Sequence, residues 1–127
     1  MYPPDLRYSV EHEWARIVGE RAVIGITRYA ADSLGDVVYV DIAQKVGESV
    51  RQFEPFGLVE SVKAASDLFA PLSGPIVQTN GRLADHPELV NQDPYGEGWM
   101  IEITVADPAE LTVLMSADEY AASLPKD

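Results

Sequence analysis

The stretch Gly57–Gly74, GLVESVKAASDLFAPLSG, runs from one apolar segment through a single lysine into a second apolar segment. Valine, leucine and phenylalanine favour strands, so Phe56–Val62 and Leu68–Leu72 are predicted to pair, with the small and polar residues of Ser61–Asp67 at the turn. Two rigid strands would then present the side chain of Lys63 at a low entropic cost. The same pattern also fits an ordinary solvated lysine, and taken alone it favours that interpretation.

Short apolar runs separated by turn residues continue on both sides of this hairpin and predict a mostly β fold. The further predicted strands are Trp14–Val18, Ala22–Ile26, Asp36–Asp41, Lys45–Val50, Ile76–Thr79 and Trp99–Val105.

Helices are predicted where capping residues flank short segments. Thr27 and Gly35 are typical capping residues at the start and the end of a helix over Arg28–Leu34. Asp107, followed by proline, and Ser116, with Glu119 three residues later, predict two C-terminal helices over about 107–115 and 116–124. We therefore expect one domain over residues 1–127, with a β core over about 7–106 and a helical segment over about 107–124.

The composition excludes several classes of function. Cysteine is absent, so disulfides, thiol catalysis and thiolate metal ligation are excluded. Nine Lys and Arg residues against 21 Asp and Glu give a formal charge of -12, which disfavours nucleic acid and anionic membranes as partners. The acidic excess fits either solubility or attraction to basic patches on partner proteins. No apolar run approaches the roughly 20 residues of a membrane span, and no signal segment is evident, so a cytoplasmic location is expected.

The sequence contains no recognisable catalytic set. His12 lies between Glu11 and Glu13; in a strand the two acids would share one face and His12 would point to the other, as a structural histidine. His86 has no neighbouring Cys or His that would complete a zinc site. The serines near Lys63 lie in no nucleophile motif. A catalytic activity of its own is therefore not expected.

The segment Val59–Ala64, VESVKA, with Ser66–Leu68 and Ala70–Pro71 after it, resembles the lipoyl-lysine segment of the glycine cleavage system H protein family. The resemblance spans roughly residues 7–124. Further blocks in the order of that family are Glu11–Trp14, Gly25–Thr27, Leu34–Val38, Glu88–Asn91, Asp93–Trp99 and Asp118–Tyr120.

This resemblance implies a lipoyl-domain-like fold, a flattened barrel or sandwich of two antiparallel sheets (a barrel-sandwich hybrid) with Lys63 at a hairpin tip. It implies a carrier and not an enzyme. Lipoate, covalently bound to Lys63, would accept an aminomethyl group from glycine decarboxylase (P protein) and present it to the tetrahydrofolate-dependent aminomethyltransferase (T protein). Dihydrolipoamide dehydrogenase (L protein) would reoxidise it, and a lipoate ligase or a lipoyl/octanoyl transferase would attach it. A monomer suits such a shuttle.

The resemblance also implies roles for four further residues. Glu60, three residues before Lys63, and Gly74, eleven residues after it, resemble positions that help the lipoylating enzyme recognise its target. Glu13 and Asp67 resemble acids near the loaded arm, where carboxylates could hold a cationic amine in a cleft. Their ordinary roles would be a strand-end acid, a turn glycine and two surface acids.

The sequence departs from the family pattern at Arg28, which replaces the usual acid and could alter a partner surface or the cleft. Several alternatives remain open: a paralogue that relays lipoate to other carriers, a biotin carrier, a ketoacid dehydrogenase lipoyl domain, or an unmodified binding module. A biotin carrier would normally have methionines beside its lysine, where this chain has Val62 and Ala64. A dehydrogenase lipoyl domain would normally be tethered by Ala/Pro-rich linkers, which this chain lacks.

Overall fold

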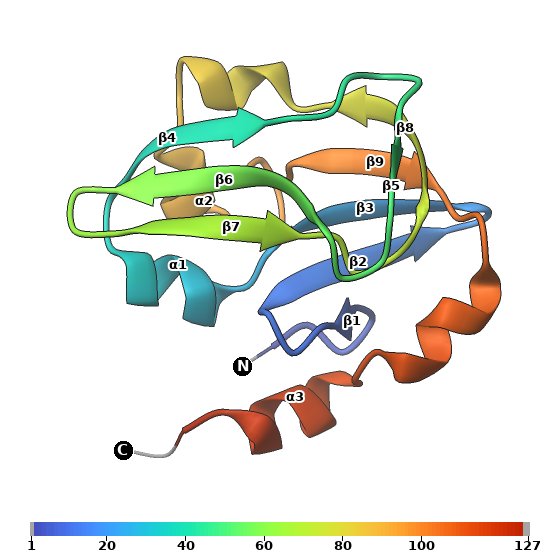
Figure 1. Cartoon of the computed structure of the whole chain (residues 1–127). Coiled ribbons are helices and arrows are strands. Elements are labelled where there is room, and N and C mark those ends of the chain that lie inside the picture. The colour runs from blue at the N-terminus through green and yellow to red at the C-terminus, as the bar shows by residue number, and fades with distance from the viewer. Residues whose placement is uncertain (1, 126–127) are drawn as a thin grey trace.

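The computed structural model describes residues 2–125, whose strands form two antiparallel sheets packed face to face (Figure 1). One sheet has six strands in the order β1-β2-β3-β9-β8-β5, and the other has three in the order β4-β6-β7. The strands are β1 (Arg7–Tyr8), β2 (Glu13–Val18), β3 (Arg21–Ile26), β4 (Val37–Ile42), β5 (Ser49–Val50), β6 (Pro55–Ser61), β7 (Ala65–Phe69), β8 (Gly74–Thr79) and β9 (Ile101–Thr104). The predicted two-sheet, mostly β fold is confirmed, and the sheets do not close into a barrel.

Short helices connect and follow the strands. They are α1 (Arg28–Leu34), η1 (Gly81–Ala84), α2 (Leu89–Gln92), η2 (Pro108–Val113) and α3 (Ala117–Ser123). The inserted helix is confirmed with its bounds: the Thr27 side chain accepts a hydrogen bond from Ala30 N, and Gly35 ends the helix with φ 80°. The predicted capping box is confirmed at the start of α3, where Ser116 and Glu119 satisfy each other's backbone N–H groups.

The first C-terminal helix differs from the prediction because it is a 3₁₀ helix over Pro108–Val113. None of its residues is buried. Only Leu111 of this segment packs against the main core, so little apolar burial is available to stabilise a longer α-helix. The predicted domain ends at residue 127, and residues 1, 126 and 127 lie outside the described part of the chain.

The main core lies between the two sheets. Fully buried side chains from both sheets meet there, among them Ile24, Phe56, Val59, Leu68 and Ile103. Strand alternation explains this arrangement, since Ala15 on β2 faces the core while its neighbour Trp14 faces the opposite side.

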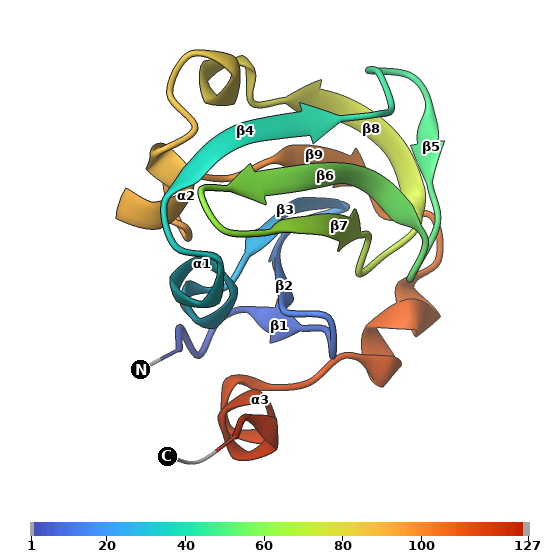
Figure 2. The ribbon, with the colours of Figure 1, turned by 60° about the vertical axis from the view of Figure 1, so that its left-hand side comes forward.

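A second apolar cluster lies on the outer face of the six-stranded sheet. Its buried members are Leu6, Tyr8, Trp14, Ala117 and Tyr120. Figures 1 and 2 show β1 and α3 together on the side of β2 that faces away from the three-stranded sheet. The N-terminal segment and α3 therefore cover this face. No helix within residues 2–125 is long and apolar enough to cross a membrane.

Candidate functional site

Lys63 lies at the tip of the β6–β7 hairpin, as predicted. The turn is tighter than Ser61–Asp67, because β7 begins at Ala65 and leaves only Val62–Ala64 between the strands. The Ser61 amide donates to Ala64 O at 2.7 Å, and the Ser61 hydroxyl oxygen accepts hydrogen bonds from the amides of Lys63 at 3.3 Å and Ala64 at 3.0 Å. The tip backbone is therefore held by its own hydrogen bonds.

The chain that follows α1 fixes the tip from the other side. The Val62 amide donates to Asp36 O at 3.1 Å. Gly35 lies against the stem of Lys63, since a Cβ added to this glycine would come within 3.4 Å of Lys63 Cε. The Lys63 side chain is exposed. The hairpin thus presents one accessible amine from a backbone that is anchored on both sides.

Of the two residues expected to guide a lipoylating enzyme, one lies near the hairpin tip and the other lies outside the hairpin. Glu60 is exposed and pairs with Ala65, the last strand pair before the tip. Gly74 is buried at the start of β8, beyond the far end of β7 from Lys63 (Figure 1). A Cβ at Gly74 would lie 1.7 Å from Thr104 O, so packing alone requires a glycine there.

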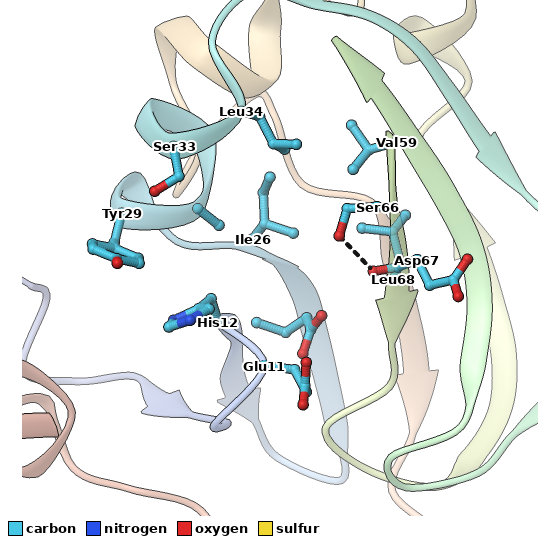
Figure 3. A pocket seen from close by; sticks show the side chains of 12 residues that line it. Glu11, His12, Ile26, Tyr29, Ser33, Leu34, Val59, Ser66, Asp67 and Leu68 are labelled. Carbon is cyan, nitrogen blue, oxygen red and sulfur yellow. Dashed lines mark hydrogen bonds between the residues drawn. The ribbon is translucent and has the colours of Figure 1, made fainter. Parts of the chain in front are cut away.

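A cleft of about 320 Å³ opens between α1, the start of β2 and the β6–β7 hairpin (Figure 3). Its apolar lining comes from both sheets and from α1, and its polar lining comes mainly from the segment before β2, from α1 and from β7. The lining residues are Glu11, His12, Glu13, Ile26, Tyr29, Ala30, Ser33, Leu34, Val59, Ser66, Asp67 and Leu68.

Glu13 ties the two sheets together at this cleft. Its side chain is 1% exposed; Oε1 accepts from the Ser9 hydroxyl at 2.7 Å and Oε2 from the Phe69 amide, on the edge of β7, at 3.1 Å. Burial raises the pKa of Glu13 to about 8, although the hydrogen bonds from Ser9 and Phe69 oppose the shift. The carboxyl group is therefore mostly protonated at neutral pH.

Asp67 lies at the rim of the same cleft, but its carboxylate is turned away from it (Figure 3). The cause is strand alternation: Ser66 pairs with the inward-facing Val59, so the next residue, Asp67, faces outward and pairs with Leu58. The structure thus brings Glu13 and Asp67 to one cleft without pointing their carboxyl groups at each other.

His12 is not placed as the strand pattern predicted. It has a left-handed backbone with φ 72° and precedes β2, so Glu11, His12 and Glu13 all line the cleft. The prediction that His12 points to the opposite face from Glu11 and Glu13 is therefore wrong. Its Nδ1 lies 2.8 Å from the Tyr120 hydroxyl, and burial lowers the pKa of the imidazole.

The sequence patterns missed the residues that support His12 and Glu13. Tyr120 of α3 is fully buried, stacks on Tyr8 and also shares a hydrogen bond of 2.8 Å with Thr27. Only its place in the block Asp118–Tyr120 indicated a constraint on this position. Ser9, which contacts Glu13, had no signal of its own.

Arg28 faces away from the cleft and toward α2. Its guanidinium donates to Asn91 O, and it pairs with Asp32 at 3.7 Å. Arg28 was expected to alter either a partner surface or the cleft. Its placement does not support an effect on the cleft. Within residues 2–125 no group of three His, Cys, Asp or Glu side chains could hold a metal ion.

Comparisons with known proteins agree with this geometry. The family model described as "Glycine cleavage H-protein" matches residues 6–127. A glycine cleavage system H protein of Brevibacillus brevis is 53% identical over 121 residues, which cover 95% of each chain. One from an Anaeromyxobacter species (strain K) is 54% identical over 120 residues, covering 94% of this chain and 93% of the relative.

A solved structure is similar throughout. The crystal structure of a glycine cleavage system H protein from Mycobacterium marinum superposes with a TM-score of 0.83 at 39% identity and covers 94% of this chain and 96% of that one. With agreement in family model, sequence and fold over almost the whole length, this chain belongs to the glycine cleavage H-protein family, whose members are carrier subunits without catalytic activity.

Proposed function

We propose that Lys63 carries a covalent lipoyl group and that the protein, as a monomer, carries an aminomethyl group on it from glycine decarboxylase (P protein) to the aminomethyltransferase (T protein). Dihydrolipoamide dehydrogenase (L protein) would then reoxidise the carrier, and a lipoate ligase or a lipoyl/octanoyl transferase would attach the cofactor. One observation carries the proposal: the lysine of VESVKA stands alone and exposed on an anchored hairpin tip in a chain of this family.

The residues near Lys63 suit a lipoyl group. The cleft next to the hairpin has apolar walls from Ile26, Val59 and Leu68, which fit a hydrocarbon arm. The chain has no cysteine, so any sulfur chemistry must come from an attached group. A lipoyl group would supply a cyclic disulfide, which is reduced when an aminomethyl group is accepted.

The acids of the cleft would have different parts in holding a cationic amine. Glu11 and Asp67 are exposed at the rim, where negative charge would attract the amine. Glu13 is buried and mostly protonated at neutral pH, so it would act as a neutral hydrogen-bonding group that also keeps the cleft in shape.

Glu60 and Gly74 would contribute to the recognition of Lys63 in different ways. Glu60, exposed one strand pair before the tip, is placed for direct contact with a lipoylating enzyme. Gly74 would act through the packing of β8 against Thr104, since it is buried beyond the far end of β7.

Reconstituted glycine cleavage with the P, T and L proteins tests the proposal. With lipoylated wild-type protein we expect sustained turnover, and with Lys63→Arg turnover no higher than without the carrier. Lys45→Arg, which changes an exposed lysine in a loop, is the matched control and should retain full activity. Turnover by Lys63→Arg would refute the proposal.

The same assay separates the alternatives. A wild-type protein that is lipoylated but supports no glycine cleavage would favour a paralogue that relays lipoate to other carriers. A protein that remains unmodified in lipoylation-competent cells would favour a binding module.

A further inference from the structure

The outer face of the three-stranded sheet forms a continuous surface next to Lys63. Strand register aligns two rows across it, Tyr39–Glu60–Ala65 nearer the tip and Asp41–Leu58–Asp67 behind it. Residues directly opposite each other in antiparallel strands have Cβ atoms about 5 Å apart, so each row is contiguous. We call these six residues, together with Val38, the open face.

No helix crosses in front of these strands in either view (Figures 1 and 2). The register of β4 against β6 shifts between Val37 and Tyr39, which marks a bulge at Val38. As a result Val38 and Tyr39, although consecutive, are 53% and 50% exposed. Bulges commonly redirect side chains next to functional sites. Here the bulge places two apolar side chains in solvent beside the hairpin tip.

All charged residues of the open face are acidic. Strands β4, β6 and β7 carry Asp41, Glu60 and Asp67 and contain no lysine or arginine. The ion pairs among residues 2–125 involve none of these three acids. The negative charge of this face is therefore not neutralised within the described chain, and Lys63 at its end is the nearest base along the hairpin.

We propose that the open face is the docking surface for the enzyme that acylates Lys63, and that this enzyme has cationic side chains around an apolar recess for Tyr39. This inference rests on the proposed function. An unmodified lysine is short, so the acylating active site must come close to the tip and to the Glu60–Ala65 pair beside it. A buried aromatic anchor with a charged rim is a common design of protein interfaces.

Initial rates of lipoylation test this surface. The full-length protein with unmodified Lys63 is incubated with a purified lipoate ligase, lipoate and ATP, and the modified fraction is followed by intact-mass spectrometry. We expect Tyr39→Ser to lower kcat/KM about tenfold, mainly through a higher KM. Glu60→Gln should lower it about threefold, and this difference should shrink as salt is raised, because screening weakens the attraction.

The matched control is Val18→Ser, which removes a similarly exposed apolar side chain (60%) from β2 of the other sheet and should change kcat/KM less than about twofold. Circular dichroism checks that each variant is folded. If the wild-type protein is lipoylated and both Tyr39→Ser and Glu60→Gln react at its rate, the docking surface alone is refuted. If the wild-type protein is not modified at Lys63, the proposed function fails and the inference fails with it.

Discussion

The outer faces of the two sheets differ in what covers them and in the charges that their strands carry. The six-stranded sheet is covered by the N-terminal segment and α3, which bury Tyr8, Trp14 and Tyr120 completely. The three-stranded sheet is uncovered, and its open face combines apolar side chains with three acids. Charge also differs: the strands of the covered sheet carry both bases and acids, whereas those of the uncovered sheet carry acids and no base.

This difference indicates a division of labour within a small protein. The six-stranded sheet is covered on its outer side by a second apolar cluster, while the three-stranded sheet leaves its outer surface and its hairpin tip free for other molecules. Lys63 lies at the tip of the hairpin that belongs to the three-stranded sheet. Substitutions on the two outer faces should therefore affect different measurements.

The largest expected effect is on the covered side. Trp14 is fully buried, its Nε1 donates to Pro94 O at 3.0 Å, and its ring lies over Gly25. Trp14→Ala should reduce the free energy of unfolding by about 3–5 kcal/mol, measured by urea denaturation. Tyr39→Ala, on the open face, should change it by less than about 0.5 kcal/mol. Similar losses from both substitutions would contradict the division.

The second largest effect separates packing from recognition at Gly74. Because a Cβ at this position would meet the backbone of Thr104, Gly74→Ala should cost about 3 kcal/mol in unfolding free energy. Gly81→Ala is the control, since no atom lies within 4 Å of the added Cβ. A Gly74→Ala protein with normal stability but slow lipoylation would instead assign this glycine a direct role in recognition.

The link between the sheets should depend on pH through Glu13. Its pKa rises to about 8 on folding, so the folded state holds a proton that the unfolded chain releases near pH 4.5. This stabilisation is fully present below pH 4.5 and is lost as pH rises through 8. Between pH 5 and 7 the wild-type protein should lose roughly 2–3 kcal/mol relative to Glu13→Gln, measured by urea denaturation at each pH. Parallel pH profiles for the two proteins would contradict this assignment.

The smallest of these effects concerns the contact of α3 with the cleft. Tyr120→Phe keeps the stacking on Tyr8 but removes the hydroxyl that lies 2.8 Å from both His12 and Thr27. The expected loss is about 1–2 kcal/mol in urea denaturation. Tyr39→Phe, which removes an exposed hydroxyl from the other sheet, should have no measurable effect. A loss of equal size for Tyr39→Phe would show that the comparison between the two faces is wrong.

Features set by neighbouring residues could be predicted from the sequence. Thr27 and Gly35 define α1, and the Ser116–Glu119 capping box begins α3, because caps act within one turn of a helix. The hairpin around Lys63 was predicted from two apolar runs. Its tip is shorter than expected because Ala65 and Ser66, small and polar in sequence, pair with Glu60 and Val59.

Features set by distant residues could not be predicted. Nothing local indicates that β1 pairs with β2. Nor does the local sequence indicate that Asn91 lies in α2 and accepts a hydrogen bond from Val37 N at 2.8 Å. The imidazole of His12, a residue with a left-handed backbone, contacts the hydroxyl of Tyr120, 108 residues away. The cleft exists because folding brings β7 to Glu13, and the raised pKa of Glu13 follows from that burial.

The most direct test of the central claim is to measure the mass of the protein and of its Lys63-containing peptide. Protein purified from lipoylation-competent cells is analysed by intact-mass and peptide mass spectrometry, with Lys63→Arg as the control. We predict a single lipoyl group, located on the peptide that contains Lys63 and absent from the variant. An unmodified Lys63, a biotinylated Lys63 or a lipoyl group that persists in Lys63→Arg would contradict the account.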